Sequence, residues 1–174
     1  MRVRHRLLHA AILATLLGGS IRTGLAASRE PLAEARVTVN FIAPERYTDA
    51  DNRFGSGPGL RGNLAEIRHI LTAAALRVMA SGDTLTVDVV DVDLAGFAHP
   101  GLNPPTGLRV VSDVTPPAFR LRYDLRRGKR SIASGEERVS DINFLLGARA
   151  IRQGSFAYED ELLRDWARRR LSAR

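Results

Sequence analysis

The segment 119–139 constrains the fold most, because its pattern fits two paired β-strands and little else. Apolar side chains alternate with polar ones in its first half, and the apolar set is Phe119, Leu121, Tyr123 and Leu125. This period of two is typical of a half-buried strand. Residues 127–129 (Arg-Gly-Lys) supply a turn, and residues 131–139 return antiparallel to complete a hairpin. The pattern predicts a sheet with one apolar face and one charged face.

Two further strands are predicted upstream of the hairpin. Residues 36–42 alternate in the same way, and so do residues 84–94. In the second of these strands the apolar positions change parity at Val89-Val90. A β-bulge there would return both halves of the strand to one core face. It would also gather three carboxylates on the exposed face: Asp88, Asp91 and Asp93.

Two helices are also predicted. Asn63 is a good capping residue and Glu66 can reach back to it, so we expect the first helix to begin there. Its apolar stripe has spacings of three and four residues and comprises Leu64, Ile67, Leu71, Ala74 and Val78. The second helix covers residues 158–171, with Leu162, Leu163, Trp166 and Ala167 on one face. Its acidic first turn, which includes Glu159, and its arginine-rich last turn both favour the helix dipole.

The predicted order of elements is strand, helix, strand, strand, strand, helix. A helix between the first two strands predicts a right-handed parallel crossover, and the hairpin adds antiparallel strands. We therefore expect one α+β domain over residues 27–174, with residues 27–35 disordered. Its mixed sheet would carry two main helices on one face and leave the other face partly polar.

The N-terminus has the layout of a secretory signal peptide. A basic start is followed by an apolar run at residues 7–17 and by small residues near Ala26 and Ala27. The run is too short to span a membrane, which needs about 20 apolar residues. We expect residues 1–26 to be removed and the mature protein to be exported to the periplasm.

Composition excludes several classes of function. Without residues 1–26 the formal charge falls from +7 to +3, so most of the basicity lies in the predicted signal peptide. Export and this modest charge argue against nucleic acid as a partner. The chain has no cysteine, which excludes cysteine nucleophiles and a lipid-anchoring cysteine. With only His69 and His99 in the mature chain, a zinc site is disfavoured, and no cofactor is indicated.

Several segments together resemble one family. They are residues 44–49 (PERYTD), 87–96 (VDVVDVDLAG), 121–123 (LRY), 133–145 (ASGEERVSDINFL) and 158–166 (YEDELLRDW). The chain is similar to secreted Gram-negative bacterial proteins grouped as domain of unknown function 3016. It departs from them at Ile142, Phe144 and Asp160-Glu161, where we would expect Met, Tyr and basic residues. The resemblance implies export and a shared fold, and it implies no activity.

Arginines are the leading candidates for a binding site. Three of them point the same way from the predicted hairpin: Arg120, Arg122 and Arg126. Such a face could hold an acidic envelope protein, a polysaccharide or a lipid headgroup. It could equally be a solvated face whose charges pair with Asp124 and Glu137.

Carboxylates offer the alternative reading. Asp88, Asp91 and Asp93 could contribute oxygen ligands to a hard cation, although no calcium-binding loop motif surrounds them. Counting along the hairpin places Glu136 on the side of Tyr123, where it would need an arginine partner. The sequence therefore favours a non-enzymatic binding or interaction module of the cell envelope. The alternative is a metal-dependent or carboxylate-based hydrolase that uses the aspartate face and Glu136.

The signal peptide gives the first testable prediction. N-terminal sequencing of the protein recovered from the periplasm should begin at Ala27 or Ser28, because small residues precede both positions. Recovery of a cytoplasmic protein that still begins with Met1 would contradict the prediction.

Overall fold

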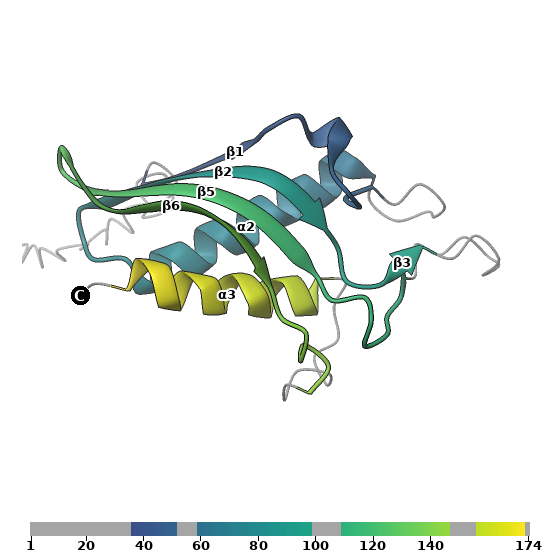
Figure 1. The fold of residues 1–174 in the computed structure, drawn as a ribbon. Helices are drawn as coiled ribbons and strands as arrows, with labels where there is room; N and C mark the ends of the chain where they lie inside the picture. Colours follow the sequence, from purple (N-terminus) through teal and green to yellow (C-terminus); the bar gives the residue numbers. More distant parts are fainter. Residues whose placement is uncertain (1–35, 52–58, 99–108, 147–155, 173–174) are drawn as a thin grey trace, which may run out of the picture.

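The computed structural model describes residues 36–51, 59–98, 109–146 and 156–172. The predicted signal peptide and the segment expected to be disordered, 27–35, lie outside these residues. Within the described chain, one curved sheet lies over two helices (Figure 1). This two-layer arrangement confirms the predicted α+β class.

The main sheet has four strands in the order β1-β2-β5-β6. The strands are β1 (Val37–Phe41), β2 (Asp83–Asp93), β5 (Ala118–Arg127) and β6 (Arg130–Ser140). β1 runs parallel to β2, whereas β5 is antiparallel to both β2 and β6. The sheet is therefore mixed, as the crossover and the hairpin of the sequence predict. β5 and β6 form a long hairpin that ends one side of the sheet.

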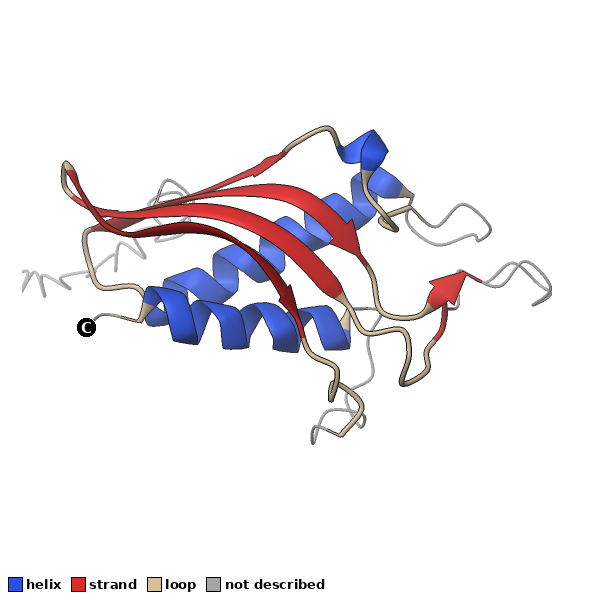
Figure 2. Cartoon of the chain, viewed as in Figure 1, coloured by secondary structure: helices blue, strands red, loops and turns tan. Residues whose placement is uncertain are grey.

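Both helices cover the same face of the sheet (Figure 2). They are α2 (Leu60–Val78), which connects β1 to β2, and α3 (Ala157–Leu171), which ends the described chain. Shorter elements lie at the end of the sheet where β2 finishes. They are the 3-10 turn η1 (Pro44–Arg46) and a two-stranded ladder of β3 (Phe97–Ala98) and β4 (Arg109–Val110).

The hydrophobic core lies between the sheet and the two helices. Its largest fully buried side chains include Trp166 and Leu163 of α3, Ile67 and Leu71 of α2, and Phe119 of β5. Each buried aliphatic or aromatic side chain of this size contributes about 1.5–3 kcal/mol through removal of apolar surface from water. The apolar stripes predicted for the two helices thus face the core, although Leu64 and Val78 remain only partly buried.

The predicted β-bulge in β2 is confirmed. Val89 pairs with Leu121 of β5, but the next pair joins Asp91 to Arg120, so Val90 is the extra residue. Because of this insertion Val89 and Val92 are both fully buried despite their different parity. The bulge keeps the core face of the strand apolar from Leu85 to Val92, and the buried Asp83 precedes this stretch.

The predicted start of the first helix is wrong by three residues. α2 begins at Leu60, and the carboxylate of Asp51 accepts a hydrogen bond from the Leu60 backbone N–H at 3.1 Å. Asn63 is buried inside the helix, where its Nδ2 donates to the Ala50 carbonyl at 2.9 Å. The residue that satisfies the helix start is therefore nine positions upstream, beyond the reach of a local capping pattern.

Glu159 also has a role that its position in the sequence does not reveal. The side chain is only 2% exposed, and its Oε1 accepts a hydrogen bond from the Ala95 backbone N–H at 2.8 Å. Burial raises the pKa of this carboxyl, although the Ala95 hydrogen bond opposes the shift. Glu159 thus connects the first turn of α3 to the chain that follows β2, in addition to any interaction with the helix dipole.

This connection gives a prediction about stability. Glu159→Ala should lower the free energy of unfolding by about 1–3 kcal/mol, because it leaves the buried Ala95 N–H without its acceptor. Glu159→Gln retains an acceptor oxygen and should cost less. Chemical denaturation of the two variants checks this order, and an equal loss in both would contradict it.

The same pair of variants tests the raised pKa. A carboxyl whose pKa is higher in the folded than in the unfolded chain stabilises the fold when protonated, below its unfolded pKa of about 4.3. That contribution is lost as the pH rises through the folded pKa. The stability of the parent should therefore fall relative to Glu159→Gln as the pH is raised through this range.

Candidate functional site

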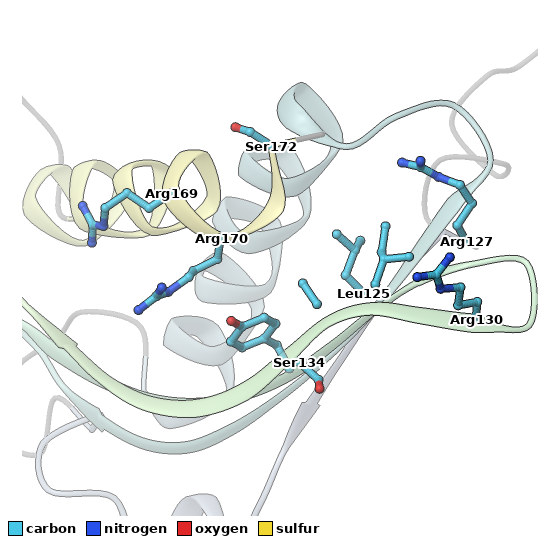
Figure 3. Close-up of a pocket in the computed structure, with 10 residues that line it drawn as sticks. Leu125, Arg127, Arg130, Ser134, Arg169, Arg170 and Ser172 are labelled. Atoms are coloured by element: carbon cyan, nitrogen blue, oxygen red, sulfur yellow. The ribbon is translucent and has the colours of Figure 1, made fainter. Parts of the chain in front are cut away.

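An open pocket lies between the β5–β6 hairpin and the C-terminal end of α3 (Figure 3). Its volume is about 380 Å³, within the range of roughly 300–1,000 Å³ typical of small-ligand sites. Four arginines, three hydroxyl side chains and three aliphatic side chains line it. They are Arg127, Arg130, Arg169, Arg170, Tyr123, Ser134, Ser172, Leu125, Ile132 and Ala133.

The hairpin builds one wall of this pocket. Its tip is the pair Gly128-Lys129, and Gly128 has a φ of 59°, a left-handed conformation that glycine adopts without strain. Close to the tip, Leu125 pairs with Ala133 but Arg126 pairs with Ser131, so Ile132 is an extra residue in β6. A bulge of this kind increases the bend and twist of a strand.

Arg127 is held by the start of β2. Its Nε and one terminal nitrogen donate to the two carboxylate oxygens of Asp83 at 2.7 and 3.0 Å. Asp83 is fully buried, and the hydrogen bond from Arg127 lowers the pKa of its carboxyl. The charge of Arg127 is therefore compensated.

Arg170 is held in the same way by β6. It donates to both oxygens of Glu137 at 2.8 and 2.7 Å, and the indole Nε1 of Trp166 donates to the same carboxylate at 2.9 Å. The Arg170 hydrogen bond, followed by that of Trp166, lowers the pKa of Glu137 against the opposing effect of burial. Trp166 also meets the Tyr123 ring edge to face, with centroids 5.5 Å apart. These contacts fix the end of α3 against the hairpin.

Arg130 and Arg169 complete the set and differ from the other two. Both side chains are exposed, one from the start of β6 and the other from the last turn of α3. In the part of the chain that the structure describes, neither has a carboxylate within salt-bridge distance. The pocket therefore has two guanidinium groups in close ion pairs and two without one, although the charge of Arg169 also acts on Glu137 at longer range.

The three arginines proposed from the sequence lie on the opposite, open face of the sheet. Arg120 and Arg122 both donate to the Glu136 carboxylate, at 2.8 and 3.0 Å. Arg126 pairs with Asp124 at 3.0 Å and also donates to the Lys129 carbonyl. The side chains point to one face as predicted, and each has an acidic partner there. Whether they bind an external anion stays a prediction.

The interpretation of Glu136 is wrong with respect to the face of the sheet. Glu136 pairs with Arg122 across the hairpin, whereas Tyr123 pairs with Gly135. Residues directly opposite each other share a face, so Glu136 lies on the open face and Glu137 on the core face. The carboxylate on the apolar side that needs an arginine is Glu137, and its partner is Arg170.

The three aspartates of β2 face away from the core, and two of them bind separate partners. Asp88 accepts from Asn40 Nδ2 at 2.9 Å, and Asp91 accepts from the Thr48 backbone N–H and hydroxyl at 2.8 Å each. Burial, and then the charges of Asp49 and Asp91, raise the pKa of Asp93. No group of three potential metal ligands occurs within the described ranges. His69 is exposed on α2, and His99 lies outside the described residues.

Sequence reasoning missed the pocket although it noted most of the arginines. The sequence pattern relates residues 168–170 to the helix dipole, and the predicted face does not include Arg130. Nothing in the local pattern shows that the last turn of α3 lies beside the hairpin. The sequence signal that could have indicated the pocket is the excess of arginine over acidic residues at the hairpin tip and in the last turn of α3.

Comparison with known proteins gives one match. The family model described as "Protein of unknown function (DUF3016)" matches residues 35–169, which is most of the chain. No curated protein and no solved structure matches. Among the described helices, none has the length and apolarity that crossing a membrane requires.

The two neighbouring glutamates provide a prediction. Glu137→Gln should destabilise the protein at neutral pH more than Glu136→Gln, because Glu137 is less exposed and holds both Arg170 and Trp166. A carboxyl with a lowered pKa contributes stability above its unfolded pKa, and this is lost as the pH falls through the folded pKa. The gap between Glu137→Gln and the parent should therefore close on acidification. Urea unfolding across this pH range checks the result, and equal effects of the two substitutions would contradict it.

Proposed function

The chain belongs to the DUF3016 family of proteins of unknown function, and we propose that it is a non-enzymatic module that binds an anionic group of a partner. The binding site in this proposal is the basic pocket, defined as the ten residues that line the space between the hairpin and the end of α3. The family match supports the fold and the relationship. The geometry of the pocket supports the proposed binding of an anionic group.

One observation carries the proposal: within the described residues Arg130 and Arg169 form no close ion pair, beside two arginines that do. Arg127 and Arg170 are immobilised by bidentate contacts with Asp83 and Glu137. They shape the pocket while their charges are compensated. The two remaining guanidinium groups are available to an incoming anion.

The chemistry of the lining favours a carboxylate or a phosphate. Guanidinium groups bind both bidentately through parallel N–H donors, and the hydroxyl of Tyr123 can supply a further hydrogen bond. The last turn of α3 carries the negative end of the helix dipole, but the full charge of Arg169 outweighs the half charge of that end. Leu125, Ile132 and Ala133 would contact the apolar part of the same ligand.

The partner in this proposal belongs to the cell envelope, because the N-terminal sequence predicts export to the periplasm. An acidic protein, an acidic polysaccharide and an anionic lipid headgroup all present suitable groups. The mature protein, beginning at Ala27 or Ser28, is therefore the material for the test.

A pair of charge-matched variants tests the site. Arg130→Gln/Arg169→Gln removes the two unpaired arginines, and Arg120→Gln/Arg126→Gln removes two paired arginines from the open face. Isothermal titration with polyglutamate, polygalacturonate and vesicles containing phosphatidylglycerol separates the three kinds of partner. The pocket variant should bind its preferred anion about tenfold or more weakly, since each charged hydrogen bond contributes about 1.5–3 kcal/mol.

The open-face variant should bind within about twofold of the parent at moderate salt, because screening removes most of a distant charge effect. Equal weakening by both variants would show attraction to overall charge and would refute the pocket. Weakening by the open-face variant alone would favour the sequence-predicted face of Arg120, Arg122 and Arg126.

A further inference from the structure

β6 is an edge strand, and within the described residues no segment pairs with its outer side. It is the last strand in the order β1-β2-β5-β6 and pairs only with β5. No backbone hydrogen bond of the described chain joins its outer edge to another segment. At 11 residues it is also much longer than β1, the five-residue strand at the other edge. An edge of this length offers a row of backbone donors and acceptors to an incoming strand.

The part of this edge beside the basic pocket has only one of the usual protective features, the β-bulge at Ile132. Natural edge strands carry charges, prolines, a β-bulge or a cover that hinders pairing. Residues 131–135 of β6 (Ser-Ile-Ala-Ser-Gly) contain no charge and no proline, and four of the five are exposed. Ile132 has 38% of its surface exposed at the bulge. The charged residues Arg130 and Glu136 stand only at the two ends of this run.

The uncharged run of residues 131–135 lies at the basic pocket. Three residues of the run line the basic pocket: Ile132, Ala133 and Ser134. Side chains of a strand alternate between the two faces of a sheet. A strand added to this edge would therefore direct every second side chain toward the pocket side, near Arg130 and Arg169.

We propose that an extended segment of an acidic partner protein adds to β6 as a further strand and places an Asp or Glu side chain in the basic pocket. This inference rests on the proposed function and names the partner class for the same site. Backbone hydrogen bonds would supply affinity, and the carboxylate would supply specificity, as in other cases of recognition by strand addition.

Charge favours this occupant over a second copy of the chain. A second β6 would bring its own uncharged run and offer no carboxylate from that run to Arg130 or Arg169. Its Glu137 is already bound by Arg170, and its Glu136 by Arg120 and Arg122. An acidic segment compensates the two unpaired arginines, whereas self-pairing leaves them uncompensated.

The test uses the mature protein and a seven-residue peptide that alternates threonine and valine around a central glutamate. Two isomers of this peptide carry backbone N-methyl groups on alternate residues, one on each edge of the extended chain. Since a strand pairs through one edge only, one isomer should lose binding about tenfold or more while the other binds like the parent peptide. Equal binding of both isomers would refute strand addition.

A glutamine version of the peptide separates the two parts of the proposal. It should bind more weakly than the glutamate peptide to the parent protein and equally to Arg130→Gln/Arg169→Gln, because the cycle isolates the contact between carboxylate and arginine. If no peptide binds but polyglutamate still depends on Arg130 and Arg169, strand addition fails and the proposed function stands. If no anion depends on these arginines, the proposed function itself fails. If sedimentation without peptide shows a dimer that forms through the β6 edges, this result would refute the acidic partner in favour of a second copy.

Discussion

The contact of α3 with the core face of the hairpin is the interaction on which the rest of the structure depends. Trp166 is 1% exposed, meets the Tyr123 ring edge to face, and donates its indole hydrogen to Glu137. Glu137 in turn binds Arg170 from the next turn of the helix. A buried aromatic group, a partly buried carboxylate and a guanidinium thus fix the helix end relative to β6. Ala167 and Leu171 bury the end of α3 in the core, and the polar contact fixes that end against the hairpin, where the two elements form the pocket.

Residue register decides which side chains take part in that contact. The sequence predicted the four strands, both helices and the bulge in β2, because each leaves a local pattern of apolar residues. It placed Glu136 rather than Glu137 on the apolar side, because the insertion at Ile132 and the small Gly135 obscure the pattern of β6. It also missed the Asp51 contact to α2 and the Glu159 contact to Ala95, since both join residues distant in the chain. The local pattern of apolar residues is therefore enough to predict the helices and strands. The residues of the site depend instead on polar contacts between distant parts of the chain.

The arginines of this protein fall into groups that differ in what their side chains bind. On the open face, Glu136 and Asp124 compensate the arginines that the sequence singled out. At the end of β2, Arg109 donates to the carbonyls of Leu94, Ala95 and Gly96, so it holds a loop. Surface pairs contribute little to stability, but they do cancel the local potential. What distinguishes the basic pocket is that two arginines without an ion pair in the described chain, Arg130 and Arg169, lie beside two arginines that have one.

An open strand edge and an unpaired positive pocket would each be a weak recognition device alone. Backbone pairing accepts almost any extended sequence, and two exposed arginines attract almost any anion. Side by side they impose a joint condition, because the ligand must be extended and must carry its charge at one register relative to β6. This condition is strict, since a one-residue slip of the added strand would turn its carboxylate to the opposite face. Selectivity can therefore arise here from the combination of a backbone edge and a fixed charge, with no enclosed cavity around the ligand.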